Sequence, residues 1–280
     1  MKFRNYLDFI KIEHTLFALP FAYAGALIAG SIDLKTSFLI FTAFFGLRTF
    51  AMSFNRIIDR EIDALNPRTA KRHLPSGMMS LKEAHTIAFF GLALYIFSAF
   101  FINWTAFLFS FIPAIVSYFY PYLKRFTCLS HYFLGLNLAF APLGGWIAVM
   151  DSINFDAEIL AFSASVIFWV AGFDIIYALQ DAEFDRKNRL HSIGAHFGER
   201  FAKRISRLNH LIFFSLLAFF LKEEIAVSLP FIAVLLFLEH YIVRKDHKEK
   251  RIQFSFFYIN AILSSTVLLS IFTNFIFKNL

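Results

Sequence analysis

The chain has 280 residues, of which 58% are hydrophobic, 19% aromatic and 17% charged, and its mean hydropathy is +0.61. Soluble domains are about 45–50% apolar and about 25% charged, so this composition excludes an ordinary water-soluble globule. The single cysteine, Cys128, excludes an intrachain disulfide framework and a multi-cysteine metal site. A net charge of +7 is compatible with nucleic-acid binding or with basic loops beside a membrane, and the positions of the charges decide between them.

Windows of about 20 mainly apolar residues, the length that crosses a bilayer as a helix, recur along the whole chain. They predict an all-α, polytopic membrane protein with about nine transmembrane helices and one domain over residues 1–280. The segments lie near residues 15–31, 37–54, 86–102, 104–120, 131–150, 158–178, 208–221, 225–243 and 255–277. The sequence also allows eight or ten spans, because segment 208–221 is short and the turn at 102–104 is tight.

The basic residues fall on one side of this nine-span arrangement. About 23 of the 27 Lys and Arg lie in the N-terminus and in the loops 55–84, 121–130, 186–207 and 244–251. Cytoplasmic loops of membrane proteins carry such an excess of Lys and Arg. We therefore expect a multi-pass protein of the inner (cytoplasmic) membrane with its N-terminus in the cytoplasm. The charge is explained as a topology signal, and no nucleic-acid partner is expected.

Two groups of polar residues spaced four apart follow the ends of two predicted spans on the cytoplasmic side. They are Asn55-x3-Asp59-x3-Asp63 and Tyr177-x3-Asp181-x3-Asp185. Residues four apart lie along one face of a helix, so each group presents a line of oxygen ligands. Like charges at this spacing repel, and Mg²⁺ commonly bridges carboxylates to a substrate phosphate. The pattern favours a magnesium–phosphate site, whereas solvated helix ends with arginine partners would explain either group alone.

Two basic segments accompany the acidic groups. Segment 66–77 follows the first group and contains Arg68, Lys71 and Arg72 between two prolines. Arg and Lys bind phosphate oxygens well, so this segment favours a phosphate-binding loop, although a generic basic loop would explain it when taken alone. Segment 120–127 carries a Lys–Arg pair among aromatic residues, and it either anchors the membrane interface or holds an acidic substrate.

In combination these motifs resemble the UbiA superfamily of intramembrane aromatic prenyltransferases. Residues 55–63 fit that family's NxxxDxxxD motif, residues 68–77 are similar to its RTxxRxLPSG continuation, and residues 177–185 fit its YxxxDxxxD motif. Residues 120–125 resemble the YPxxKR loop of the 4-hydroxybenzoate branch. Residues 55–69 also resemble bacterial enzymes that prenylate a dihydroxynaphthoate, so the resemblance leaves the acceptor open.

The resemblance implies nine helices around a central cavity that binds Mg²⁺ and a polyprenyl diphosphate. By analogy, the metal-binding and catalytic carboxylates are Asp59, Asp63, Asp181 and Asp185. The residues expected to contact the prenyl diphosphate are Asn55, Arg68, Arg72 and Tyr177. Lys124 and Arg125 are expected to contact the carboxylate of the aromatic acceptor. The expected partners are the two substrates and the lipid bilayer.

The reaction implied is the Mg²⁺-dependent transfer of a polyprenyl group to a ring carbon of 4-hydroxybenzoate or a dihydroxynaphthoate, in ubiquinone or menaquinone biosynthesis. Mg²⁺ and arginines would neutralise the leaving diphosphate, and the cavity would exclude water from the allylic cation. Asp174, Glu13 and His14 are candidates for the base, with structural roles as the alternative. The alternative function is a divalent-cation or proton-coupled transporter, although transporter sites usually lie near the midplane.

Overall fold

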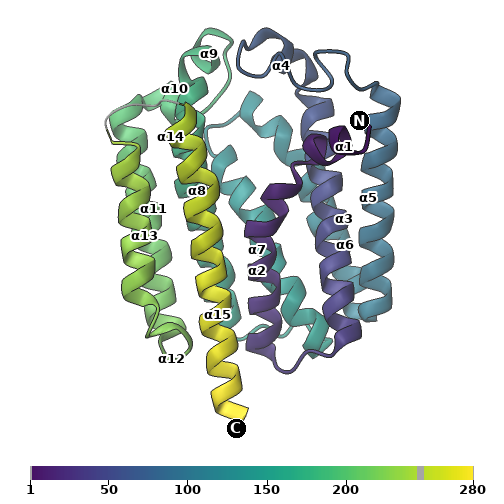
Figure 1. Cartoon of the computed structure of the whole chain (residues 1–280), viewed down its shortest axis with the longest axis vertical. Helices are drawn as coiled ribbons and strands as arrows, with labels where there is room; N and C mark the ends of the chain where they lie inside the picture. Colours follow the sequence, from purple (N-terminus) through teal and green to yellow (C-terminus); the bar gives the residue numbers. More distant parts are fainter. Residues whose placement is uncertain (1, 245–248, 280) are drawn as a thin grey trace.

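The computed structural model describes residues 2–244 and 249–279. Within these ranges the chain forms helices and no strand, which confirms the all-α prediction. The long helices run side by side, and short helices lie at their ends (Figure 1). The helices are α1 (Lys2–Ile10), α2 (Ile12–Ala29), α3 (Leu34–Ile58), α4 (Arg60–Leu65), α5 (Leu81–Ile102), α6 (Trp104–Phe119), the 3₁₀ helix η1 (Tyr120–Arg125), α7 (Ser130–Met150), α8 (Ala157–Ala178), the 3₁₀ helix η2 (Leu179–Asp181), α9 (Ala182–Lys187), α10 (Ile193–Phe197), α11 (Glu199–Phe220), α12 (Lys222–Ile225), α13 (Leu229–Ile242), α14 (Glu249–Phe254), the π-helix η3 (Ser255–Ile259) and α15 (Asn260–Asn279).

Six helical segments of the described ranges are long and apolar enough to cross a membrane. They are Leu34–Ile58, Leu81–Ile102, Trp104–Arg125, Ser130–Met150, Ala157–Lys187 and Ile252–Lys278, and two shorter apolar helices cover Ala18–Ala29 and Leu229–Ile242. Helix α11 is as long as a span, but its first half is basic. The chain is a multi-pass helical membrane protein, with six candidate spans where the sequence predicted about nine.

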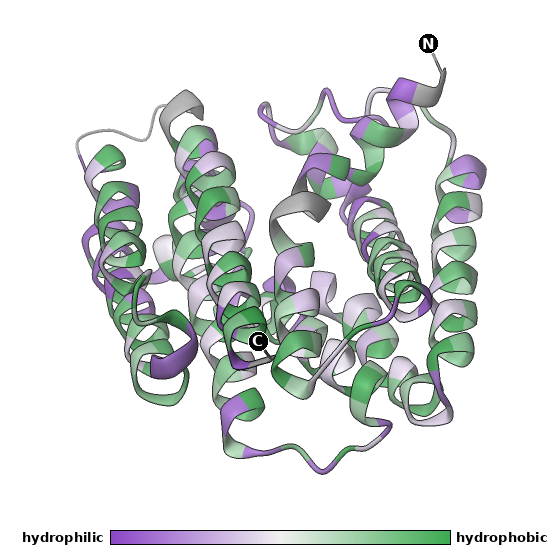
Figure 2. Cartoon of the chain, turned by 60° about the horizontal axis from the view of Figure 1, so that its bottom comes forward, coloured by the Kyte–Doolittle hydropathy of each residue, from purple (hydrophilic) through white to green (hydrophobic). Residues whose placement is uncertain are grey.

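The outward faces of the helices are apolar. Figure 2 shows hydrophobic residues along the helices and hydrophilic residues gathered mainly in the connecting segments. Many of the 41 phenylalanines point outward, as Phe97 and Phe219 do with 64% and 76% of their surface exposed. A large exposed apolar surface is unfavourable in water and is accepted by lipid, so these rings suit the membrane-facing side of the bundle.

Glycines bring α3 and α5 into close contact. Gly46 of α3 and Gly91 of α5 face each other, and a Cβ added at Gly46 would lie 2.6 Å from the backbone nitrogen of Tyr95. Small residues at helix interfaces allow such backbone approach, which is a main source of packing energy inside membranes. The contact fixes α3, and with it the first acidic motif at the end of that helix.

Helix α8 lies in the middle of the packing. Trp169 is fully buried, and its ring lies 4.7 Å from that of Phe21 in α2 and 6.3 Å from that of Phe213 in α11. Because neighbouring helices surround α8, its C-terminal end has a fixed position. That end and the end of α3 lie at the same end of the bundle, beside α9 and α4 (Figure 1).

The structure differs from the expected segments in two places. Helix α11 begins at Glu199 rather than near residue 208, because its basic first half is amphipathic and buries Ala202 and Ser206. The segment expected near 225–243 forms one helix only from Leu229 to Ile242 (α13), and Ile225 belongs to the preceding short helix α12. Pro230 stands in the first turn of α13, where a missing backbone N–H is tolerated.

Candidate functional site

A cavity of about 380 Å³ opens between α2, α3, α5, α6, α7 and α8. At one end it is lined by residues of both acidic motifs, namely Asn55, Asp59, Tyr177, Asp181 and Asp185. Towards the other end of the same helices its walls are apolar and include Ile40, Phe109 and Phe140. A pocket that changes from charged to apolar along its length fits a ligand with an anionic head and a hydrocarbon tail.

Each acidic motif is interrupted at its middle aspartate. Helix α3 ends at Ile58 and α4 begins after Asp59, whose backbone has φ −89° and ψ 2°. In the second motif α8 ends at Ala178, and Asp181 is the last residue of η2, directly before α9, with φ −103° and ψ −2°. The straight helical face expected from the four-residue spacing is therefore bent in both motifs. As a result Asp59 lines the cavity, while Asp63 lies on the separate helix α4.

Three of the carboxylates bind cations that come from other segments. Asp59 is 2% exposed, and its Oδ2 lies 2.5 Å from Lys124 Nζ, while its Oδ1 lies 3.3 Å from Arg125 Nη1. Burial raises the pKa of the Asp59 carboxyl, and the charges of Lys124 and Arg125 oppose that rise. Arg72 Nη1 donates to both oxygens of Asp63 at 2.8 Å. The acids are thus neutralised by lysine and arginine from the loops at this end.

Asn66 and Arg68 join the first motif to the second. Arg68 Nε donates to Asp181 Oδ1 at 2.9 Å, its Nη2 pairs with Oδ2, and Asn66 Nδ2 donates to the same Oδ1 at 2.8 Å. The Arg68 guanidinium also lies 5.4 Å from the centre of the Tyr177 ring, and its Nη1 donates to the Tyr177 hydroxyl at 3.2 Å. Asn66 was missed by the sequence analysis, although it stands directly before Pro67 in the segment singled out as basic.

The donor set suits a hard divalent cation. Asp59, Asp181 and Asp185 supply carboxylate oxygens to one cavity, which is the ligand chemistry that Mg²⁺ prefers. Within the described ranges, no three His, Cys, Asp or Glu side chains surround a common point. The reason is visible in the ion pairs, since Asp59 and Asp181 turn towards Lys124 and Arg68. The residues fit Mg²⁺ by type.

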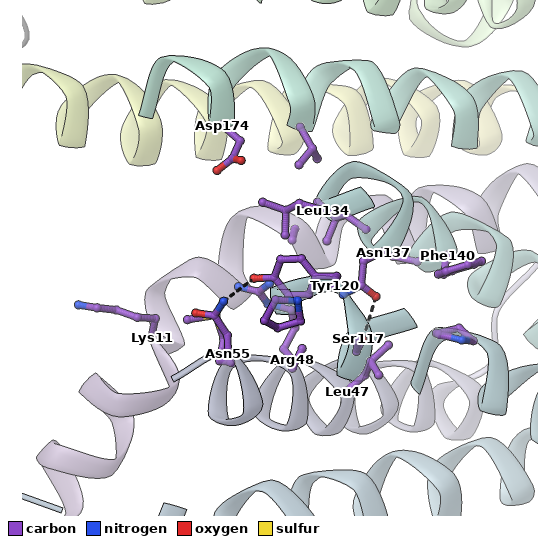
Figure 3. A pocket seen from close by; sticks show the side chains of 18 of the residues that line it. Lys11, Leu47, Arg48, Asn55, Ser117, Tyr120, Leu134, Asn137, Phe140 and Asp174 are labelled. Atoms are coloured by element: carbon purple, nitrogen blue, oxygen red, sulfur yellow. Dashed lines mark hydrogen bonds between the residues drawn. The ribbon is translucent and has the colours of Figure 1, made fainter. Parts of the chain in front are cut away.

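Arg48 is a cavity cation that the sequence analysis did not assign. It lies on α3 two turns before Asn55 and beside Tyr120, whose hydroxyl accepts a hydrogen bond from the Asn55 amide at 3.0 Å (Figure 3). The Arg48 Nε is buried without a hydrogen-bond partner, and the guanidinium has no ion pair in the described part of the chain. An arginine inside a predicted span was the available signal, because such charges are costly and mark functional sites.

Asp174 points into the cavity from α8 (Figure 3) and binds a histidine. Its Oδ2 lies 2.7 Å from Nδ1 of His131, which is 3% exposed at the start of α7. The Nε2 of His131 faces the backbone N–H of Ile193 at 3.5 Å and accepts from it, so the Nδ1 proton is donated to Asp174. Of the other candidate bases, Glu13 pairs with Lys11 at 3.1 Å, and the side chain of His14 is outside the described set.

The fold and the cavity define a multi-pass helical membrane protein with two acidic motifs facing an amphiphilic pocket. The chain matches the UbiA prenyltransferase family over residues 18–262, and it belongs to that family. It is 30% identical over 226 residues to a 4-hydroxybenzoate octaprenyltransferase of Vibrio cholerae. The aligned region covers 78% of this chain and 77% of that protein. A protein of the same name from Francisella tularensis subsp. novicida is 31% identical over 165 residues, 59% of this chain and 57% of its own length.

Solved structures share the fold. The apo structure of a UbiA homolog from Aeropyrum pernix superposes with a TM-score of 0.83 at 35% identity, covering 94% of this chain and 98% of that chain. A UbiA homolog from Archaeoglobus fulgidus bound to DMAPP and Mg²⁺ gives a TM-score of 0.74 at 23% identity, over 95% and 99% of the two chains. These similarities agree with the family resemblance inferred from the motifs.

Proposed function

We propose that this protein transfers a prenyl group from a polyprenyl diphosphate to a ring carbon of an aromatic acid. The observation that carries the proposal is the ion pair of Arg68 with Asp181, which brings the phosphate-type loop onto the second acidic motif at the charged end of an apolar cavity. The curated relatives are named for 4-hydroxybenzoate, and a dihydroxynaphthoate is the second candidate acceptor. Ubiquinone or menaquinone biosynthesis is the corresponding route.

The carboxylates Asp59, Asp181 and Asp185, with Asp63 behind them, would hold Mg²⁺, which supplies Lewis-acid stabilisation of the leaving diphosphate. Arg68 and Arg72 bind the diphosphate oxygens, and their forked donors match phosphate geometry. Asn55 and Tyr177 complete the contacts to the diphosphate. The prenyl tail runs along the apolar wall towards Phe109 and Phe140.

For the acceptor carboxylate, the geometry favours Arg48 over the sequence-based candidates Lys124 and Arg125. Both of those cations are engaged by the buried Asp59, and Arg125 also donates to the backbone carbonyl of Ile58 at 2.9 Å. Arg48 lines the cavity and has a buried Nε without a partner. A buried arginine is stabilised by an anion, and an aromatic carboxylate of the right size supplies one.

The reaction forms a bond between the prenyl C1 and the acceptor ring carbon and breaks the bond between C1 and the diphosphate oxygen. The proton displaced from the ring carbon passes to Asp174, which points into the cavity and is held by His131. The apolar walls keep water from the allylic carbon until the ring attacks. Diphosphate leaves with both electrons of the broken bond, so charge and atoms balance.

We also propose that nine helices cross the membrane, because α2, α11 and α13 run beside the six candidate spans (Figure 1). In this arrangement the acidic motifs and the basic loops share the cytoplasmic end of the bundle at the inner membrane. The bias of Lys and Arg towards the loops at that end supports this orientation. The polyprenyl diphosphate would enter the cavity from the bilayer.

The proposal is tested with purified protein in nanodiscs, radiolabelled geranyl diphosphate, 4-hydroxybenzoate and Mg²⁺. We expect Asp59→Asn and Asp181→Asn each to lower transfer by at least about 10²-fold, because charge stabilisation of the leaving group is lost. Glu183→Gln is the matched control, since Glu183 lies within the second motif but is exposed and pairs with Lys187. Unchanged transfer in both aspartate variants would reject the role assigned to these carboxylates, whereas Mg²⁺ flux into liposomes without any transfer would reject the proposed function in favour of transport.

A further inference from the structure

A second group of buried polar side chains lies outside the cavity, where α8, α11, α13 and α15 meet. Glu239, Asn260 and His210 are 1%, 0% and 2% exposed. Glu239 belongs to the apolar helix α13, and its Oε2 has no hydrogen-bond partner among the described residues. A buried carboxylate is costly unless it is hydrogen-bonded, so its remaining contacts are informative.

The contacts of Glu239 lead to a π-helical turn. Residues Ser255–Ile259 form this turn between α14 and α15, and π turns are rare and frequently occur at functional sites. The Asn260 amide donates to Glu239 Oε1 at 3.3 Å and to the carbonyls of Phe256 and Ser255 at 3.0 and 3.4 Å. Asn260 therefore satisfies carbonyl groups of the widened turn, and Glu239 holds the amide that does so.

The π turn sets the position of Phe256 in the cavity wall. The Phe256 ring lies 4.6 Å from the ring of Tyr177 and packs edge-on against Phe173 at 5.1 Å. The Tyr177 ring in turn lies beneath the Arg68 guanidinium, and its hydroxyl accepts from Arg68. A shift of Phe256 would therefore displace the Tyr177 ring and, with it, Arg68, the cation that pairs with Asp181.

The same cluster contacts α8 directly. His210 Nε2 donates to the carbonyl of Trp169 at 3.3 Å, and its ring packs so tightly on Gly172 that a Cβ there would lie 2.2 Å from His210 Cδ2. The Nδ1 of His210 lies 3.0 Å from His240 Nε2 and 3.7 Å from Glu239 Oε2. The cluster thus contacts both elements that carry the Phe256–Tyr177 contact: the π turn, which carries Phe256, and α8, which carries Tyr177.

We propose that Glu239 and Asn260 are positioning residues, which hold the π turn so that Phe256 supports the Tyr177 ring beneath Arg68. They touch neither substrate, and they act on the binding of the prenyl diphosphate through that contact. This inference rests on the proposed function, because it takes the prenyl diphosphate to be the ligand of Arg68 and Tyr177. The acceptor end of the cavity, around Arg48, lies outside this chain of contacts.

The test compares Asn260→Leu and Glu239→Leu with Glu239→Gln, whose amide oxygen still accepts the hydrogen bond from Asn260. We expect the two leucine variants to raise the KM for geranyl diphosphate about 10-fold, since displacements near 1 Å cost up to about 10²-fold, with the KM for 4-hydroxybenzoate nearly unchanged. Glu239→Gln should stay near the unmodified protein. Phe256→Leu should show the same selective rise, and Phe256→Leu with Asn260→Leu should add little to either single change.

Asn209→Leu is the matched control, because Asn209 is a 2% exposed asparagine on α11 that binds Tyr132 rather than the cluster. It should destabilise the fold without a selective change in the KM for geranyl diphosphate. The inference would be overturned if Asn260→Leu and Glu239→Leu raised the KM for geranyl diphosphate and the KM for 4-hydroxybenzoate equally. An unchanged KM for geranyl diphosphate in Phe256→Leu, or additive effects in the double variant, would also overturn it.

Amide hydrogen exchange over residues 252–262, measured without substrates, separates this inference from the proposed function. Asn260→Leu should speed exchange in the π turn, and unchanged exchange would overturn the positioning role. If Asn260→Leu and Glu239→Leu do not fold, an unchanged KM for geranyl diphosphate in Phe256→Leu, or a changed one in Glu239→Gln, would still overturn the inference. Absence of geranyl diphosphate binding and transfer in the unmodified protein would refute the proposed function, and with it the assigned ligand, independently of the exchange result.

Discussion

Arg68 and Asp181, which stand 113 residues apart, form a two-point ion pair between the loop after α4 and the 3₁₀ helix η2 that follows α8. The Asn66 amide shares the same carboxylate oxygen. Because the pair ties the two acidic motifs together, it shapes the charged end of the cavity. A planar guanidinium can make this fork, whereas a lysine ammonium acts as a single point charge.

We expect Arg68→Lys to raise the KM for geranyl diphosphate about 10-fold, because the second hydrogen bond to Asp181 and the stacking on Tyr177 are both lost. Steady-state kinetics in nanodiscs measure this change. Arg60→Lys serves as the control, since Arg60 belongs to the first motif but makes a surface pair with Glu61 at 3.3 Å. Such exposed pairs contribute little, so equal effects at both positions would contradict the role of Arg68.

Replacement of Arg48 by glutamine should act on the acceptor. We expect Arg48→Gln to raise the KM for 4-hydroxybenzoate at least about 10-fold, because the carboxylate loses its buried counter-charge. The preference for 4-hydroxybenzoate over the uncharged 4-hydroxybenzamide should fall by a similar factor. Arg125→Gln is the informative comparison: if it abolishes this preference and Arg48→Gln does not, the carboxylate is held by the η1 segment instead.

Asp174→Asn should slow the removal of the ring proton. General-base catalysis contributes about 10²–10⁴-fold, so we expect kcat to fall within that range while the KM for geranyl diphosphate changes little. With acceptor deuterated at the reacting ring carbon, the isotope effect on kcat should increase in Asp174→Asn relative to the unmodified protein. An isotope effect that stays the same while kcat falls would show that Asp174 does not take this proton.

Mg²⁺ and the diphosphate should bind cooperatively. The acids at the charged end are already paired with Lys124, Arg72 and Arg68, so Mg²⁺ alone competes with those cations. We expect geranyl diphosphate to strengthen Mg²⁺ binding at least about 10-fold, and Mg²⁺ to strengthen diphosphate binding by the same factor, as linkage requires. Isothermal titration calorimetry measures both. Lys124→Ala should tighten the binding of Mg²⁺ alone, and independent binding of the two ligands would refute the explanation.

Gly46→Ala should destabilise the bundle. The added methyl group would lie 2.6 Å from the backbone nitrogen of Tyr95 and 2.7 Å from the carbonyl oxygen of Gly91, where neither backbone can yield cheaply. Overpacking of this kind costs about 1–3 kcal/mol, which thermal unfolding in detergent detects. Gly144→Ala is the comparison, because a Cβ there meets nothing within 4 Å. Similar melting temperatures for both variants would argue against the close α3–α5 contact.

Hydropathy and four-residue spacing were sufficient to find the six candidate spans and the acidic motifs. Both signals are local: an apolar window such as 158–178 and a pattern such as Asp181-x3-Asp185 are complete within a few turns of chain. The interruption of each motif at Asp59 and Asp181 was not predicted, because spacing alone assumes a straight helix. Helix α11 was predicted too short for a related reason, since its amphipathic start falls below an apolar threshold.

The amino-acid sequence by itself determined the all-helical membrane class and the family, and it predicted the chemical type of the candidate site. Only the tertiary structure decided which charge meets which partner: Lys124 and Arg125 on Asp59, Arg68 on Asp181, and His131 on Asp174. The physical reason is that pairing energy depends on distance in space and on burial, and both are set by how helices distant in the chain pack together. Arg48 became the proposed acceptor contact in the same way, because its packing leaves it facing the cavity without an ion-pair partner in the described residues.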